Sequence, residues 1–220
     1  MIFKAGTVGR PQNDRQIKAG IMRRFGMAAL AAAAISVLAL APATSAQAEG
    51  NFLRIINSVE APEGFSGLCD QYSWLCVAEA RASVAERDWL GLAKKVNAEV
   101  NRNVREITDA RQYGREELWA LPTRRGGDCE DFALLKKREL MALGISANRL
   151  LIATVLDRRR EPHAVLVLRT GAGDLVLDNL RNKISIWSDT GYSFLRMQDP
   201  DNPQNWKAVL AGGVFAQANL

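Results

Sequence analysis

The spacing of apolar residues changes halfway along the chain, and this change limits the folds that the sequence can adopt. Between residues 89 and 107 apolar side chains recur every three or four positions, which predicts a helix that extends to Tyr113 and ends at Gly114. This apolar stripe consists of Trp89, Leu92, Ala93, Val96, Val100, Val104 and Ile107. A second helix is predicted to begin at Cys129 and to end at Gly144.

The second half of the chain contains short apolar runs separated by turn residues. These runs predict strands over residues 149–157, 163–169 and 174–179. Because the connections between them are short, we expect an antiparallel sheet. Residues 192–206 include two prolines, and we expect them to form a long irregular loop. Helices followed by strands predict an α+β fold, with N-terminal helices packed on an antiparallel sheet.

The N-terminal segment has the features of a secretory signal peptide. Residues 27–40 are an uninterrupted run of small and apolar side chains, two arginines precede it, and Ala46-Gln47-Ala48 provides a cleavage site. The run is shorter than the about 20 residues that span a bilayer, and it lacks the amphipathic pattern of a buried helix. We therefore predict a signal peptide at residues 1–48 and one exported domain at residues 49–220, without stable membrane insertion after cleavage.

The positive charge of the chain belongs to this leader. The full sequence has 29 basic and 24 acidic residues, a formal net charge of +5. Six of the basic residues and one of the acidic residues lie within the predicted signal peptide, so the remaining domain has no net charge. A nucleic-acid partner is therefore not expected, since such binding relies on a basic surface.

Three cysteines and one histidine limit the chemistry that the domain can perform. Cys69 and Cys76 are separated by six residues, and in an exported protein we expect them to form a structural disulfide. Their spacing is too wide for a zinc knuckle, and His163 is the only histidine, so a zinc site is not favoured.

Cys129 stands at a predicted helix start, where a thiol can be reactive. The helix dipole there favours the thiolate, and free backbone N–H groups can donate to an oxyanion. Asp128, Glu130 and Asp131 flank the cysteine and would raise its pKa unless a cation neutralises them. The alternative is that Cys129 is only a small packed residue and that the three acids, with Asp128 at the N-cap, stabilise the helix start.

His163 and Asp178 are predicted to lie at the same end of the sheet. His163 begins one strand and Asp178 ends the next, and in an antiparallel hairpin these two positions are adjacent. An acid beside the imidazole would fix its tautomer, so the sequence predicts a catalytic triad of Cys129, His163 and Asp178. The alternative is an ordinary surface or core histidine and an ordinary turn at Asp178-Asn179.

About half of the predicted domain resembles the bacterial transglutaminase-like cysteine peptidases. The similar segments are residues 96–122, 126–145, 149–170 and 174–180. The sequence GGDCEDFA, followed by HAVL and then LDN, is much more specific than an isolated cysteine or histidine. The pair Cys69 and Cys76 also matches an N-terminal cysteine pair of that family.

This resemblance implies a papain-like, transglutaminase-like fold and an exported cysteine peptidase, periplasmic or secreted, that uses the predicted triad. The better-known relatives are periplasmic proteases that cleave surface adhesins, which implies a protein substrate such as an adhesin. Because the domain is small, we also expect a protein partner that presents the substrate or regulates the enzyme.

The resemblance also implies a calcium site and no organic cofactor. The relatives bind calcium through acidic residues around the nucleophile, and Asp128, Glu130 and Asp131 match positions of that type. Calcium prefers oxygen ligands and would offset the carboxylates beside the thiolate.

Two alternatives to a peptidase stay open at the level of the sequence. An acyl-thioester on Cys129 would give hydrolysis with water but transglutamination with an amine, and the residues do not distinguish the two. A non-catalytic binding module on the same fold is the other alternative, although all three triad positions are occupied.

Overall fold

A computed structural model of the chain describes residues 50–78 and 82–216. The predicted signal peptide at residues 1–48 lies outside the described residues and stays a prediction. The predicted domain at residues 49–220 is described except at its ends and at residues 79–81. Within the described ranges we find no helix that is both long and apolar enough to cross a membrane.

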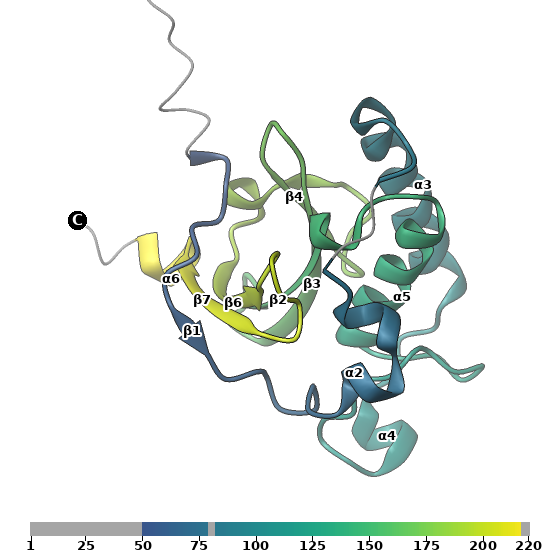
Figure 1. Cartoon of the computed structure of the whole chain (residues 1–220). Helices are drawn as coiled ribbons and strands as arrows, with labels where there is room; N and C mark the ends of the chain where they lie inside the picture. Colours follow the sequence, from purple (N-terminus) through teal and green to yellow (C-terminus); the bar gives the residue numbers. More distant parts are fainter. Residues whose placement is uncertain (1–49, 79–81, 217–220) are drawn as a thin grey trace, which may run out of the picture. The chain divides into compact units, whose positions relative to one another are not determined.

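The longer helices come before the main strands in the described chain (Figure 1). They and the short helical turns are α2 (Leu68–Gln71), η1 (Ser73–Cys76), α3 (Glu86–Asn103), α4 (Asp109–Tyr113), α5 (Cys129–Ala142), η2 (Ala147–Arg149), η3 (Trp187–Thr190) and α6 (Gly213–Ala216). α5 begins at the predicted residue, Cys129. Gly144, predicted to end this helix, follows it with a positive φ of 93°.

The prediction of one helix from residue 89 to Tyr113 is wrong, because the structure divides this segment into α3 and α4. The backbone after α3 turns extended at Val104. The main chain of Gly127 then accepts from Ile107 at 3.0 Å and donates to Arg105 at 3.1 Å. These bonds replace those of a continuous helix and hold the loop before α5 against the segment between α3 and α4.

Seven strands form one sheet in which every neighbouring pair is antiparallel, in the order β1-β7-β6-β2-β3-β4-β5. They are β1 (Ser58–Val59), β2 (Leu150–Leu156), β3 (Pro162–Arg169), β4 (Asp174–Leu177), β5 (Ser185–Ile186), β6 (Ser193–Gln198) and β7 (Trp206–Ala211). The three predicted strands correspond to β2, β3 and β4. The predicted α+β fold is confirmed.

The expectation of an irregular loop over residues 192–206 is wrong. Most of the segment's first half is β6, and its last residue, Trp206, begins β7. Pro200 and Pro203, which favoured a loop, lie between the two strands, where proline removes no ladder hydrogen bond. Phe194 and Met197 are fully buried, which fixes β6 in the sheet.

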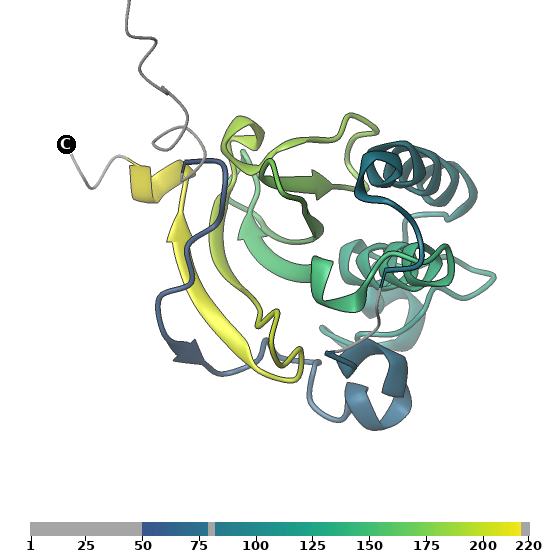
Figure 2. The ribbon, with the colours of Figure 1, turned by 45° about the horizontal axis from the view of Figure 1, so that its top comes forward.

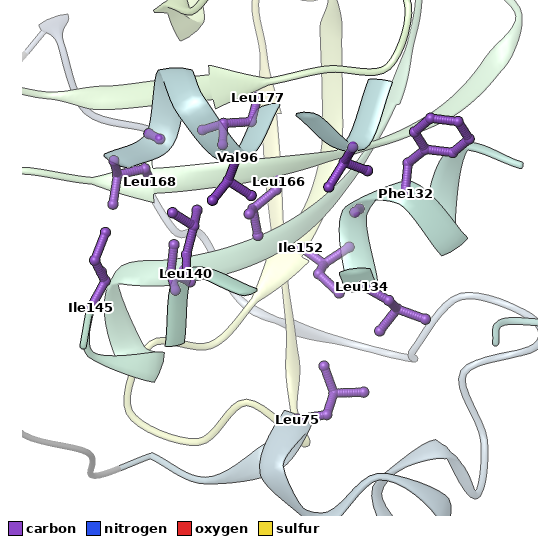
Figure 3. Packing of buried hydrophobic residues seen from close by; sticks show 14 of the residues in the cluster. Leu75, Val96, Phe132, Leu134, Leu140, Ile145, Ile152, Leu166, Leu168 and Leu177 are labelled. Atoms are coloured by element: carbon purple, nitrogen blue, oxygen red, sulfur yellow. The ribbon is translucent and has the colours of Figure 1, made fainter. Parts of the chain in front are cut away.

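The sheet is buried on both faces, which explains the continuous apolar runs of its strands. In β2, Ile152 faces the helices and packs with Leu134 and Leu140 of α5 (Figure 3). The neighbouring residues Leu151 and Ala153 point to the opposite face and pack in a second apolar cluster. α5 contacts β2 and β3, and α3 packs on α5, so the helices cover one face of the sheet beside these strands (Figure 2).

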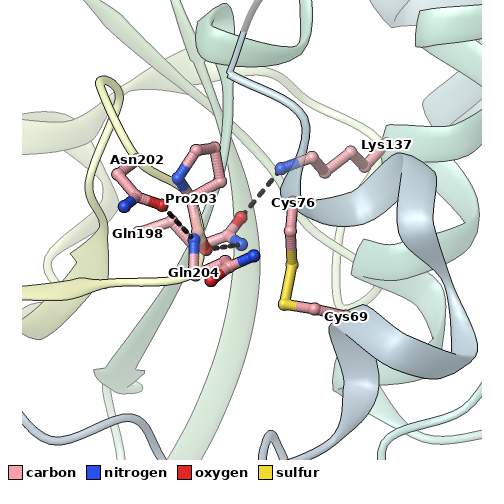
Figure 4. Close-up of a disulfide and its surroundings, with 7 residues drawn as sticks. All are labelled: Cys69, Cys76, Lys137, Gln198, Asn202, Pro203 and Gln204. Carbon is pink, nitrogen blue, oxygen red and sulfur yellow. Dashed lines mark hydrogen bonds between the residues drawn. A yellow bond between two sulfur atoms is a disulfide. The ribbon is translucent and has the colours of Figure 1, made fainter.

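Cys69 and Cys76 form the predicted disulfide, which connects α2 to η1 (Figure 4). Their Cα atoms are 5.6 Å apart, a normal separation for a disulfide. The buried side chains of Leu68 and Leu75 lie next to the two cysteines in sequence and belong to the main core.

Removal of this disulfide is expected to lower the free energy of unfolding by about 2–3 kcal/mol, because the short loop gains freedom mainly in the unfolded chain. The test is urea denaturation of a Cys69→Ser/Cys76→Ser variant, with Cys129→Ala in both proteins to prevent thiol exchange. An unchanged transition midpoint would show that the bond does not stabilise the fold.

Candidate active site

Two glycines set the backbone that leads into Cys129. Gly126 has a φ of 125°, and a side chain there would collide with the carbonyl group of Arg105. A side chain at Gly127 would overlap the carboxylate of Asp131. The glycine pair is therefore required by close packing, and it delivers Cys129 to the first turn of α5.

The surroundings of Cys129 oppose ionisation of its thiol. Burial, followed by the charge of Glu130 and a hydrogen bond to it, raises the thiol pKa well above its usual value. The thiol donates to the Glu130 carboxylate, with 3.2 Å between Sγ and Oε2. A backbone hydrogen bond from Ala164 acts in the opposite direction and lowers this pKa. The expected effect of the flanking acids is thus present, and it adds to the larger effect of burial.

His163 and Asp178 meet at one end of the β3–β4 hairpin, as their positions in the two strands predict. The Nε2 atom of His163 lies 2.9 Å from Oδ1 of Asp178, and the two side chains are only 6% and 2% exposed. Burial would raise the pKa of Asp178, but its hydrogen bond and ionic contact with His163 and the hydroxyl of Tyr192 lower it overall. Asp178 is therefore an anion that can orient the imidazole.

Two of the predicted triad residues share one pocket, and the third, Asp178, contacts one of them, His163. Cys129 and His163 both line this pocket, and the residue after His163, Ala164, hydrogen-bonds to Cys129 through its backbone. Because Nε2 of His163 is occupied by Asp178, Nδ1 is the nitrogen that remains for the thiol. The walls of the pocket include Pro62, Glu63, Glu117, Trp119, Thr154, Leu195 and Arg196.

A group of carboxyl side chains lies beside Cys129, and its membership differs from the predicted one. One oxygen each of Asp109, Asp128 and Glu130 lies within 4.8 Å of the others. Asp131 is outside this group, and its Oδ1 accepts from the backbone N–H of Ala120 at 2.9 Å. Asp109 begins α4, which the pairing of residues 105–107 with Gly127 brings close to α5.

Two oxygens of this group, and one of the nearby Asp131, are buried without a hydrogen-bond partner. They are Oδ1 of Asp109, Oδ1 of Asp128 and Oδ2 of Asp131. Burial and the charge of Asp128 raise the pKa of Glu130 to about 9. A buried carboxyl oxygen normally has a hydrogen-bond partner or a bound cation, and a hard divalent cation with oxygen ligands would satisfy these atoms. The residues present therefore fit calcium.

The side chain of Asp128 does not cap α5. This residue occupies the N-cap position, but its side chain makes no capping hydrogen bond. Instead, its Oδ2 accepts from the backbone N–H of Asp109 at 3.1 Å. The side chain therefore connects the start of α4 to the start of α5.

The chain matches the sequence model of one protein family over residues 55–213, described as bacterial transglutaminase-like cysteine proteinase BTLCP. No curated protein matches the chain. Among solved structures, calcium-bound Legionella pneumophila LapG is 25% identical to this chain and has a TM-score of 0.47. The matched region spans 56% of this chain and 71% of the LapG chain. Another LapG structure from the same organism is 26% identical and has a TM-score of 0.47. Its matched region spans 59% of this chain and 74% of the LapG chain.

Proposed function

The chain belongs to the bacterial transglutaminase-like cysteine proteinases, and we propose that it hydrolyses a peptide bond of a periplasmic or surface protein through Cys129, His163 and Asp178. The observation that carries this proposal is the buried contact of 2.9 Å between His163 and Asp178, in the same pocket as the thiol at the start of α5. The predicted signal peptide supports an exported enzyme, and the family resemblance supports a surface adhesin as the class of substrate.

The reaction follows from the positions of the three side chains. Nδ1 of His163 takes the proton of the Cys129 thiol, and the sulfur attacks the carbonyl carbon of the scissile bond. Backbone N–H groups at the start of α5 donate to the oxyanion that forms. Nδ1 then returns the proton to the leaving amine, and an acyl-thioester remains on Cys129. Water, activated by the same nitrogen, releases the acid and restores the thiol.

We propose calcium as the cation of the carboxylate group, with Asp109, Asp128 and Glu130 as the residues that would hold it. The earlier assignment of Asp131 stays a prediction, since Asp131 lies near the group but outside it. A bound divalent cation would supply positive charge that offsets the carboxylates beside the thiol. The residues of the chain perform every step of the reaction above.

Calcium is expected to increase the rate at which iodoacetamide alkylates Cys129. If the cation lowers the thiol pKa by one unit, the rate at pH 7 rises about tenfold, because the thiolate is the reacting form. The measurement compares the protein in excess calcium with the protein in a chelator. Asp109→Asn should reduce the calcium effect, and Asp189→Asn, at an exposed acid of η3, should not. Equal rates with and without calcium would contradict the assignment.

The experiment that tests the proposed function compares the protein with Cys129→Ala on a mixture of periplasmic and surface proteins, in calcium and in chelator. New fragments with the unaltered protein alone support the peptidase. Equal fragmentation by both proteins would exclude Cys129 as the nucleophile. A fluorescent primary amine in the same mixture detects transglutamination, because it becomes attached to protein only if an amine captures the thioester. If the unaltered protein and Cys129→Ala both bind an intact protein from the mixture and neither cleaves it, a binding module is favoured.

A further inference from the structure

Tyr192 contacts two of the three triad residues from a buried position just before β6. Its hydroxyl donates to Oδ2 of Asp178, with 2.5 Å between the oxygens. Its ring packs edge-on against the imidazole of His163, with the ring centroids 5.9 Å apart and an angle of 84° between the planes. The side chain is 1% exposed, so solvent cannot replace these contacts.

The direction of the hydrogen bond between Tyr192 and Asp178 is fixed. Burial and the Asp178 carboxylate raise the pKa of the Tyr192 phenol far above neutrality, so the hydroxyl keeps its proton. The pKa of Asp178 is lowered, so its carboxylate accepts. Arg181 adds to the arrangement, because its Nη2 donates to the Tyr192 hydroxyl at 3.0 Å and its Nε lies 3.4 Å from Oδ2 of Asp178.

The two carboxylate oxygens of Asp178 therefore have separate partners. Oδ1 faces His163 and also accepts from the backbone N–H of Leu180 at 3.0 Å, whereas Oδ2 faces Tyr192 and Arg181. The backbone of Asp178 is held independently by α3, since Asn101 donates to its carbonyl oxygen at 2.8 Å. Rotation of the carboxylate is thus restricted at both oxygens, and at Oδ2 the restriction comes from the side chains of Tyr192 and Arg181.

We propose that Tyr192, supported by Arg181, is a positioning residue of the reaction, which fixes the carboxylate of Asp178 so that Oδ1 remains directed at Nε2 of His163. This inference rests on the proposed function, because it requires that His163 and Asp178 act on Cys129. A carboxylate that can rotate would hold the imidazole less firmly, and Nδ1 would spend less time in line with the thiol.

Alkylation of Cys129 by iodoacetamide tests this inference without a known substrate. Cys129 is the free cysteine of the chain, since the other two are paired, so the rate reports on this thiol. The rate is measured in calcium at pH 7 for Tyr192→Phe, Asp178→Asn and the combination of both. Tyr192→Phe keeps the ring against His163 and removes the hydroxyl. Tyr72→Phe is the matched control, because its hydroxyl accepts from Leu121 and Gln71 and contacts no triad residue.

We expect Tyr192→Phe to slow alkylation by about tenfold, the effect of losing one hydrogen bond to a charged group. Addition of Tyr192→Phe to Asp178→Asn should slow it by less than about twofold further, because the target of the hydroxyl is already altered. A merely structural effect of Tyr192 would instead be the same in both backgrounds. Tyr72→Phe should react at the rate of the unaltered protein.

The outcomes separate failure of this inference from failure of the proposed function. If Asp178→Asn reacts as fast as the unaltered protein, the proposed triad is wrong. If Asp178→Asn is slow but Tyr192→Phe is not, or if the two effects simply multiply, only the positioning role is wrong. Should Tyr192→Phe fail to fold in a thermal unfolding experiment, Arg181→Gln, at a more exposed residue, replaces it. We expect Arg181→Gln to slow alkylation by about threefold. When it is combined with Asp178→Asn, we expect no such additional slowing.

Discussion

Asp178→Asn is expected to lower the rate of peptide hydrolysis by about 10³- to 10⁴-fold while the protein stays folded. The carboxylate of Asp178 accepts at both oxygens, from His163 and Leu180 at one and from Tyr192 and Arg181 at the other. An amide has one acceptor and one donor end. If the NH₂ group faces His163, Nε2 must accept, and the proton moves to Nδ1, which then cannot take the thiol proton.

The opposite orientation of the amide is no better. It keeps an acceptor toward His163 but directs the NH₂ group at Arg181, a donor that has no alternative role. Both orientations therefore disturb the imidazole or its support. The measurement is the initial rate of cleavage of the protein substrate that the comparison with Cys129→Ala identifies. Asp189→Asn, at an exposed acid, serves as the control for the loss of a carboxylate. A rate within a few-fold of the unaltered protein would contradict the role of Asp178.

The meeting of His163 and Asp178 could be predicted because it depends on local chain geometry. One residue begins a strand and the other follows the next strand, and a short antiparallel hairpin leaves them no other arrangement. The start of α5 at Cys129 could equally be predicted from the sequence, since Gly126 and Gly127 precede it and acids occupy its first turn. These features need no information from distant parts of the chain.

Asp109 and Tyr192 could not be predicted, because their positions depend on long-range contacts. Asp109 joins the carboxylate group only because the first helix breaks after Asn103 and the next residues pair with Gly127. Apolar periodicity continues through this break, so the sequence favoured one helix. Tyr192 reaches Asp178 only because β6 pairs with β2, whereas the prolines after β6 favoured a loop.

Lys137→Met is expected to stabilise the protein at pH 7 by several kcal/mol. Lys137 is fully buried in α5, and its Nζ donates to Oε1 of Gln198 at 2.9 Å (Figure 4). Within the described part of the chain no carboxylate lies within ion-pair distance of it. Burial lowers its pKa to about 7, against about 10.4 in the unfolded chain, a difference that corresponds to about 4–5 kcal/mol of lost stability at low pH.

The lowered pKa of Lys137 makes its destabilising effect depend on pH. Between about pH 7 and pH 10 the unfolded chain holds a proton on Lys137 that the folded protein lacks, so this residue makes stability rise with pH in that range. Below about pH 7 the folded protein must carry the buried charge, and the full penalty is present. The substitution leaves Gln198 satisfied, because Oε1 also accepts from the backbone N–H of Ile152 at 3.1 Å.

Urea denaturation at pH 7 and pH 9.5, with Cys129→Ala in every protein, measures the effect. The advantage of Lys137→Met should be largest at pH 7 and shrink by about 1.4 kcal/mol for each pH unit between these values. Lys136 and Glu130, which are also buried and shifted, titrate in both proteins and cancel in the difference. Lys94→Met, at an exposed residue of α3, should change neither the stability nor its slope with pH. A variant no more stable than its parent at pH 7 would show that the Lys137 ammonium is stabilised by contacts other than the one to Gln198.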